Sequence, residues 1–339
     1  MKLKKAITAC IAVLLLFGAA ACRSRNEHVP PVTPPETIPP VISSLPDTTP
    51  SLPEFSEPES SFFEEYESEN EFEDESESSL REDHPLPEGS ELTSESVAAA
   101  MSTDFEEIGA HDGVKITQFT GGDPDSKNRP AAPLLMQQKY GDLGAVFINP
   151  HNDRIYLTFD EGYENGYTSR ILDTLKAKNV KAVFFITYPY AKTEPALVRR
   201  MIAEGHVVGS HSTAHKIFPD MHIEDAARDL LFLHEYVKAN YGYEMWLFRP
   251  PEGAFSEQTL ALAGSIGYKT VLWSFAYKDY DTADQPLTIE ATDRIVSKAH
   301  AGEVCLLHAV SRTNAEILGD VIDQIRAKGF EFADTFLFS

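Results

Sequence analysis

The sequence predicts an α/β fold built around a parallel sheet, either open or closed into a barrel. From residue 154 onward, short apolar segments alternate with segments whose apolar residues recur at helical spacing, as in repeated strand–helix units. Polar clusters follow several of the predicted strands, and parallel α/β folds place their sites at that edge of the sheet. The region after residue 134 spans about 200 residues, enough to bury a substantial core.

Residues 1–22 have the pattern of an export signal. Lysines precede the apolar run Ile11–Phe17, which is too short for a comfortable spanning helix, and small residues precede Cys22. The run Gly18–Cys22 resembles a bacterial lipobox, so we expect Cys22 to carry a lipid that anchors the chain to a membrane. The alternative is an ordinary signal peptide cleaved at Ala-x-Ala. Both interpretations place the protein outside the cytoplasm, facing the cell wall.

Residues 23–100 are expected to form a disordered linker, Pro-rich at first and acidic afterwards. Six prolines lie between residues 30 and 40, and residues 51–83 carry 14 acidic side chains against one arginine. Such a segment cannot bury enough apolar surface to offset the entropy of ordering it, and its like charges keep it extended. It therefore suits a spacer that passes through a cell wall.

The net charge of −24 excludes one class of partner. Residues 51–83 contribute −13 of this charge, while residues 135–339 hold 27 acidic and 20 basic side chains, which is an ordinary balance. Binding to a duplex nucleic acid requires a basic patch, and the sequence has none. We therefore expect no nucleic-acid partner.

The elements are assigned in chain order from their apolar periodicity. Residues 101–150 are expected to be an irregular lead-in to the domain at 151–339, with a short helix at 134–140 and a short strand at 145–148. Beyond it, apolar runs predict strands at 155–159, 181–186, 207–210, 245–248, 270–274, 304–308 and 330–332. Segments with apolar residues three and four positions apart predict helices at 168–178, 195–204, 223–240, 257–264, 289–299 and 314–327.

Two predicted strands end in residues suited to metal binding or acid–base chemistry. Asp160 and Glu161 follow the first strand and precede a glycine, so they could serve as a base and a metal ligand, although a solvated turn has the same composition. His211 and His215 follow the third strand. Their i, i+4 spacing would let both imidazoles reach one divalent metal from a helical turn. Such a pair is weak evidence alone, and the carboxylates two strands away strengthen it.

Three further strand ends carry polar or aromatic groups. Arg249 precedes two prolines that fix the loop, and it could pair with a buried carboxylate and keep it ionised. Trp273 lies near the end of the fifth strand, with Asp279 and Tyr280 shortly after it, and His308 ends the sixth. A surface arginine, a loop-capping aspartate and a satisfied core histidine are the structural alternatives for Arg249, Asp279 and His308.

In chain order these clusters resemble the five motifs of the polysaccharide deacetylase (NodB-homology) family. The family pattern is Thr-Phe-Asp-Asp-Gly, His-Ser/Thr-x-x-His, Arg-x-Pro-x-Gly, Asp-Trp and Leu-x-His, and the resemblance extends from residue 134 to the end of the chain. It implies a distorted (β/α) barrel with fewer than eight complete units. It also implies hydrolysis of N-acetyl groups on a glycan, with a divalent metal, usually zinc, as cofactor.

The resemblance also implies roles for the groups at the first four strand ends. His211 and His215 would hold the metal, with Glu161 at the position of the family's carboxylate ligand. Asp160 would act as general base on a water molecule bound to the metal. Arg249 would pair with Asp160 and keep it ionised and oriented.

The remaining groups would act on the leaving group, the oxyanion and the sugar. His308 would protonate the leaving amine, with Asp279 keeping its imidazole charged and aimed. The backbone N–H at Glu252 would stabilise the tetrahedral oxyanion. Trp273 and Tyr280 would line the substrate site.

A closer resemblance is to the PdaA-like delta-lactam-biosynthetic de-N-acetylases of this family. It is carried by the runs Thr158–Thr168, Phe248–Glu257 and Leu306–Glu316. This subgroup removes acetyl from muramic acid in peptidoglycan, and the freed amine closes onto the lactyl group to form muramic δ-lactam. The implied partner is a peptidoglycan glycan strand, and we expect the chain to act as a monomer.

Three positions depart from the pattern and keep other functions open. Glu161 replaces a metal-binding Asp, or the Asn of the subgroup, Glu252 replaces an Arg, and Tyr280 replaces a Trp. One alternative is a catalytically silent, wall-tethered glycan-binding protein, and another is a deacetylase of a different N-acetylglucosamine polymer. A plain structural lipoprotein would leave five polar clusters at strand ends unexplained.

Overall fold

The structure, a computed structural model, describes residues 105–334 and 336. The export signal with Cys22, the linker at 23–100 and residues 101–104 lie outside the described residues, so what the sequence suggests for them stays a prediction. Within the described part, no helix combines the length and the apolar character needed to cross a membrane.

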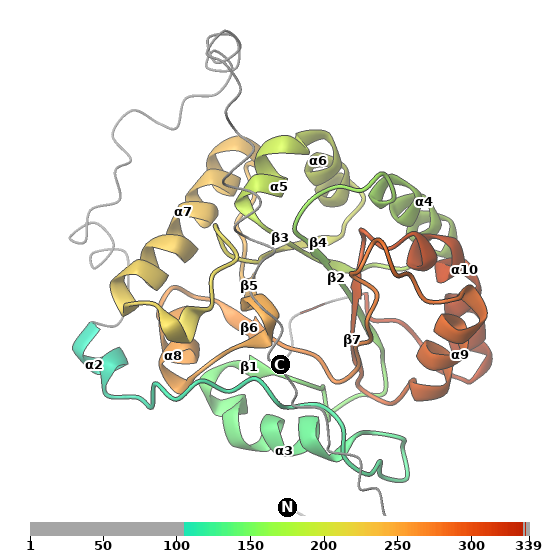
Figure 1. Cartoon of the computed structure of the whole chain (residues 1–339), viewed down its shortest axis with the longest axis horizontal. Helices are drawn as coiled ribbons and strands as arrows, with labels where there is room; N and C mark the ends of the chain where they lie inside the picture. The colour runs from blue at the N-terminus through green and yellow to red at the C-terminus, as the bar shows by residue number, and fades with distance from the viewer. Residues whose placement is uncertain (1–104, 335, 337–339) are drawn as a thin grey trace, which may run out of the picture. The chain divides into compact units, whose positions relative to one another are not determined.

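Within residues 105–334, seven parallel strands form one sheet (Figure 1) in the spatial order β1-β6-β5-β4-β3-β2-β7. The strands are β1 (Ala145–Val146), β2 (Tyr156–Glu161), β3 (Val183–Ile186), β4 (Val207–Ser210), β5 (Leu247–Phe248), β6 (Lys269–Val271) and β7 (Val304–His308). Because all neighbours are parallel, the carboxyl ends of the strands meet at one edge, as the sequence predicts.

Helices surround this sheet (Figure 1). The helices are α2 (Phe105–Gly109), α3 (Ala131–Tyr140), α4 (Thr168–Lys178), α5 (Tyr188–Thr193), α6 (Pro195–Ala203), α7 (Ile223–Tyr241), α8 (Glu257–Ser265), α9 (Thr288–Lys298) and α10 (Arg312–Ala327), with short 3-10 turns η2 (Gly141–Leu143), η3 (Phe218–Asp220) and η4 (Pro251–Gly253). The six helices predicted beyond residue 154 begin and end within two residues of their predicted positions. Only α5 of this region is new, since six residues give too little periodicity to detect.

The predicted strand at 330–332 is wrong. This segment makes only an isolated parallel bridge between Phe332 and Ile155, which directly precedes β2. From Thr158 onward, β2 is paired with β7 on one side and β3 on the other, so a strand at 330–332 could not extend far along β2. The seventh strand is β1, which confirms the short strand predicted at 145–148 in the lead-in and pairs with β6.

The curled sheet is linked across its open side by the segment that follows β6. The N–H of Ser274 donates to the carbonyl of Val304 at 3.0 Å, and the N–H of Leu306 donates to the carbonyl of Phe275 at 2.9 Å. These bonds join the segment after β6 to β7, at the opposite end of the strand order. The result is the distorted barrel expected from the motifs, with the predicted polar groups around one rim.

Alternate strand residues fill two separate parts of the core. On β3, Val183 and Phe185 pack inside the barrel, whereas Phe184 and Ile186 pack against the helices. This alternation follows from the two-residue period of a strand. Because both of its faces are covered, β3 is apolar throughout.

A buried histidine–glutamate pair lies where β7 meets the segment after β6. The Nδ1 atom of His300 is 3.2 Å from Oε2 of Glu303, and its Nε2 atom is 2.8 Å from the hydroxyl of Ser274. Burial raises the pKa of Glu303 to about 8 and lowers the pKa of His300. Both side chains are therefore neutral near pH 7.

Replacing Glu303 with glutamine is expected to stabilise the protein at alkaline pH. The unfolded chain ionises this group near pH 4.5, while the folded protein keeps it protonated up to about pH 8, so the wild type loses stability as pH rises through this window. Glutamine does not titrate. The stability of E303Q relative to wild type should therefore rise by on the order of 3 kcal/mol between pH 5 and pH 9. Urea unfolding at both pH values measures this difference, and a difference independent of pH would contradict it.

Candidate active site

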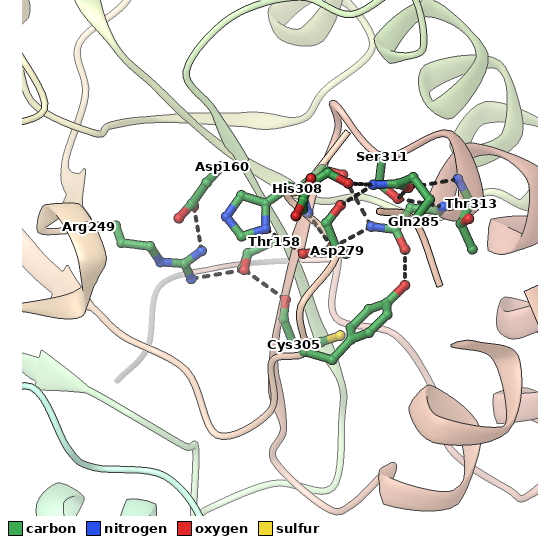
Figure 2. A network of polar contacts seen from close by, with 12 residues as sticks. Thr158, Asp160, Arg249, Asp279, Gln285, Cys305, His308, Ser311 and Thr313 are labelled. Atoms are coloured by element: carbon green, nitrogen blue, oxygen red, sulfur yellow. Dashed lines mark hydrogen bonds and ion pairs between the residues drawn. The ribbon is translucent and has the colours of Figure 1, made fainter. Parts of the chain in front are cut away.

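A buried ion pair connects the ends of β2 and β5. Arg249 follows β5, and its Nη1 donates to Oδ1 of Asp160 at 2.7 Å (Figure 2). The other guanidinium donors bind Thr158 Oγ1 at 2.9 Å, the Val271 carbonyl at 2.9 Å and the Leu272 carbonyl at 3.1 Å. Burial opposes the ionisation of Asp160, but the charge of Arg249 and the neighbouring histidines outweigh it and lower the pKa of Asp160. The site thus holds an oriented carboxylate.

Aromatic rings support the guanidinium of Arg249. Its Cζ atom lies 4.2 Å from the ring centre of Phe185 and 5.7 Å from that of Trp273. Trp273 also packs against Gly253, where an added Cβ would lie 2.5 Å from the indole and where φ is +68°. Trp273 is therefore a partly buried wall of the site, and contact of its ring with a substrate remains a prediction.

The two predicted imidazole ligands lie edge to face after β4, with ring centres 4.9 Å apart. The Nδ1 atom of His211 is 2.9 Å from the carbonyl oxygen of Arg249. A carbonyl only accepts, so Nδ1 carries the proton and Nε2, which lies 3.6 Å from Oδ2 of Asp160, keeps its lone pair. Burial lowers the pKa of His211 to about 4 and lowers the pKa of His215. Both imidazoles are therefore neutral near pH 7, as metal ligands must be.

A carboxylate on α7 holds the loop that carries these histidines. Asp229 accepts from the N–H groups of Thr213 at 2.7 Å and Ala214 at 3.3 Å. The loop needs this support because Ser212 and His215 have positive φ values of 73° and 52°, which are uncommon for residues with side chains. Asp229 is not among the site residues that the sequence predicts. Its signal is a carboxylate on the otherwise apolar, buried face of α7.

Glu161 is fully buried, and neither carboxylate oxygen has a hydrogen-bond partner. Burial and the charges of Glu164 and Asp160 raise the pKa of Glu161 well above its usual range. A buried carboxylate without donors favours binding a proton or a cation. Within the described range, no three His, Cys, Asp or Glu side chains are already grouped to hold a metal. The two neutral imidazoles suit a divalent metal, and ligation by Glu161 stays a prediction.

A second charged pair faces the first from β7. His308 lies opposite Asp160 in the β2–β7 register, and its Nδ1 is 2.7 Å from Oδ1 of the buried Asp279 (Figure 2). Burial acts to lower the pKa of His308, but its hydrogen bond with Asp279 and the charges of Asp279 and Asp160 raise it. Tyr280 is 57% exposed, and its ring lies edge-on to the imidazole with centres 5.5 Å apart. An acid-competent imidazole and an exposed aromatic ring thus share one rim.

Glu252 lies in the η4 turn with a left-handed backbone, at φ 56° and ψ 9°. Its side chain is exposed, and its charge acts to raise the pKa of His215 against the larger effect of burial. The negative charge of Glu252 therefore reaches the pair of imidazoles. The use of its N–H as an oxyanion donor remains a prediction.

The predicted residues thus gather at one rim of the barrel as two facing pairs, Asp160–Arg249 and Asp279–His308, with two imidazoles beside the first. A separate cavity of about 530 Å³ lies elsewhere, between α3 and the beginnings of β1 and β6, and is lined by residues including Gln137, Asp142 and Lys269. None of the predicted site residues lines it. The candidate site is therefore identified by the chemistry of the rim and not by this cavity.

Comparison with known proteins gives the same family that the motifs suggest. A family model for polysaccharide deacetylases matches residues 148–271. The chain is 40% identical over 185 residues to the peptidoglycan-N-acetylmuramic acid deacetylase PdaA of Bacillus subtilis, covering 54% of this chain and 70% of PdaA. It is 33% identical over 181 residues to the peptidoglycan-N-acetylglucosamine deacetylase PgdA of Listeria monocytogenes, covering 53% of this chain and 38% of PgdA.

A solved structure shows the same architecture. The structure of Bacillus subtilis PdaA, described as a family 4 carbohydrate esterase, aligns with a TM-score of 0.61 and 35% sequence identity. The alignment covers 65% of this chain and 95% of PdaA. The similarity therefore extends over nearly the whole of that domain.

Proposed function

Because this chain belongs to the polysaccharide deacetylase family, we propose that it removes the acetyl group from N-acetylmuramic acid in peptidoglycan, a step that leads to muramic δ-lactam. The enzyme is a hydrolase of C–N bonds, and its relatives act on peptidoglycan. The observation that carries the proposal is the two facing pairs, Asp160–Arg249 and Asp279–His308. They place an oriented carboxylate on β2 opposite an imidazole of raised pKa on β7. Base and acid of this kind are what amide hydrolysis needs.

In the proposed reaction His211 and His215 hold a divalent metal, with Glu161 as a further ligand. Zinc suits imidazole ligands, and when bound it would polarise the acetyl carbonyl and acidify a water molecule. Asp160 takes the proton from the attacking water, and Arg249 keeps that carboxylate ionised and aimed. The geometry of these residues and the family resemblance support the roles proposed for them.

The other side of the site serves the leaving group. His308 gives its proton to the nitrogen as the C–N bond breaks, so that acetate and the free amine leave the site. Asp279 holds the imidazole through Nδ1. The N–H at Glu252 stabilises the oxyanion, and Trp273 and Tyr280 support the sugar ring.

We further propose that the enzyme works outside the cytoplasm as a monomer, attached to a membrane by a lipid on Cys22 and facing the wall across the linker. The export pattern of residues 1–22 and the composition of residues 23–100 support this arrangement. Labelling with a radioactive fatty acid in cells would test it, because Cys22→Ser should abolish incorporation. Incorporation that survives this change would place the lipid elsewhere.

Acetate release from N-acetylated peptidoglycan fragments tests the function directly. The purified chain, reconstituted with Zn²⁺, should release acetate from muramic acid, and EDTA should abolish the release until zinc is restored. His211→Ala should lower the rate by about 10²-fold or more, because an imidazole ligand is lost. Fragments with and without stem peptides define the preferred substrate.

Two other results would redirect the assignment. Release only from N-acetylglucosamine residues would replace the proposed substrate while keeping the chemistry. Tight fragment binding without release, at stoichiometric metal, would establish the silent glycan-binding alternative. In that case Glu161 would be the first position to change to aspartate.

A further inference from the structure

We propose that Asn314, in the first turn of α10, is a positioning residue that fixes the carboxylate of Asp279 and, through it, the imidazole of His308. This inference rests on the proposed deacetylation, in which His308 protonates the leaving amine. Asn314 lies outside the five motifs and touches no reacting atom. Its contribution is the orientation of the acid.

Asp279 is fully buried, so its charge depends on the donors around it. Oδ1 pairs with Nδ1 of His308 at 2.7 Å. Oδ2 accepts from the N–H of His308 at 2.8 Å and from Nδ2 of Asn314 at 2.5 Å. Asn314 therefore supplies the only one of these three donors that does not come from His308 itself. Without it, the backbone N–H of His308 would be the one donor of this set that holds the carboxylate independently of the imidazole.

The amide of Asn314 is itself held in one orientation. Its Nδ2 also donates to the carbonyl of His308 at 3.2 Å, and its Oδ1 accepts from the hydroxyl of the buried Tyr277. Reversing the amide would bring its oxygen against the Asp279 carboxylate and the carbonyl of His308, which can only accept, and both bonds would be lost. With 1% of its surface exposed and every side-chain donor and acceptor used, Asn314 cannot be replaced by an aspartate or leucine without loss of a bond.

A structural role in α10 does not account for this side chain. The helix is already capped by Ser311, whose hydroxyl accepts from the N–H of Asn314 at 3.1 Å. Gln285 separately ties the same loop to α10, since its Nε2 donates to the backbone carbonyl of Asp279 at 2.8 Å and its Oε1 accepts from Ser311 at 2.6 Å (Figure 2). At Asp279, Gln285 binds only the backbone carbonyl and not the carboxylate. Asn314 holds the carboxylate oxygen itself.

The orientation of Asp279 decides what His308 can do. A carboxylate fixed at Nδ1 keeps that proton in place, stabilises the imidazolium and leaves Nε2 as the nitrogen that donates. The side chain of His308 is 23% exposed, so Asp279, on its buried side, sets its direction. Loosening Asp279 should therefore lower both the fraction of protonated imidazole and the fraction correctly aimed.

The test is Asn314→Leu, which keeps the number and branching of the heavy atoms, although its methyl groups are larger, and removes both donors and the acceptor. We expect kcat to fall about 10–100-fold with KM changed less than about twofold, by analogy with outer-shell changes at metal sites. The pKa of His308, followed by NMR of labelled histidine and assigned with His308→Gln, should fall towards the ordinary histidine value. Tyr277→Phe, a milder change that removes only the hydroxyl orienting the amide, should shift both quantities in the same direction by less.

Asn149→Leu is the matched control. Asn149 is also buried, and its Nδ2 donates to the hydroxyl of Tyr156 at 2.8 Å, but Tyr156 begins β2 at the edge away from the site. This variant should lose stability without moving kcat or the pKa of His308. The proposal is overturned if that pKa is unchanged or raised in N314L, or falls equally in N149L. Absence of acetate release by the wild type would instead overturn the proposed function, and the titration would still decide the positioning role.

Discussion

Asp160→Asn is expected to lower kcat for acetate release by about 10²–10⁴-fold, the usual contribution of a general base. The change should leave the site intact, because the amide oxygen of asparagine can still accept the hydrogen bond that Arg249 donates at 2.7 Å. Asparagine cannot accept a proton from water, so the loss should fall on the chemical step. Binding of an N-acetylated fragment, measured calorimetrically, should change little.

The control for this prediction is another arginine-paired aspartate. Asp125 pairs with Arg129 at 2.6 Å in the segment before α3 and contacts none of the site residues described above. Asp125→Asn should therefore keep the wild-type kcat. Wild-type activity in D160N would remove Asp160 from the role of base, and loss of fragment binding would mean that the substitution had damaged the site rather than its chemistry.

The fold could be predicted largely because its signals are local. The helices α4 and α7 are capped by Asn179 and Gly242, both in the left-handed conformation, and the apolar periodicity of each helix stops at its cap. The strands at the edges of the sheet were harder to predict from the sequence. β1 has only two residues, and its place in the sheet depends on pairing with β6 more than a hundred residues later. Such long-range pairing leaves no periodic signal.

The residues of the candidate site also differ in whether the sequence could predict them. Among the motif residues, Asp160 directly follows a predicted strand and His308 ends one, so the parallel sheet brings them to one rim. Asp229, Gln285 and Asn314 act from a helix, a loop and a helix N-terminus. Their partners are set by tertiary packing, and their types are common at such positions. Of the three, only Asp229 carries a signal in the sequence, because a carboxylate on an apolar helix face requires donors.

Glu161 shows where motif and structure diverge. A motif position predicts a ligand type, and glutamate keeps the carboxylate that a divalent metal can bind. The extra methylene changes where the oxygens lie, and in this structure they meet no donor. Direct measurement of the zinc affinity of the wild type and of Glu161→Asp would show whether the carboxylate alone, or also the position of its oxygens, decides binding. Tighter binding by the aspartate variant would show that side-chain length limits the site.

Arg249→Met is expected to lower the free energy of unfolding by about 3–5 kcal/mol, because it would leave the buried carboxylate of Asp160 without its counter-ion. It would also remove the donors to Thr158 and to two backbone carbonyls. Methionine fills similar space, so the loss should be electrostatic rather than a cavity effect. Urea unfolding measures it. Arg200→Met, at a surface arginine that pairs with Asp173 and Glu204, should cost at most about 1 kcal/mol.

The double variant D160N/R249M separates charge from packing. If the cost of R249M comes from an unpaired buried charge, neutralising Asp160 should recover part of the lost stability, and the double-variant cycle should give a coupling energy of about 1–3 kcal/mol. A double variant less stable than R249M would mean that the guanidinium acts mainly through its bonds to Thr158 and the carbonyls. Activity should not return in either case, since the same carboxylate that makes Arg249 necessary for folding is the group that takes the proton in the proposed reaction.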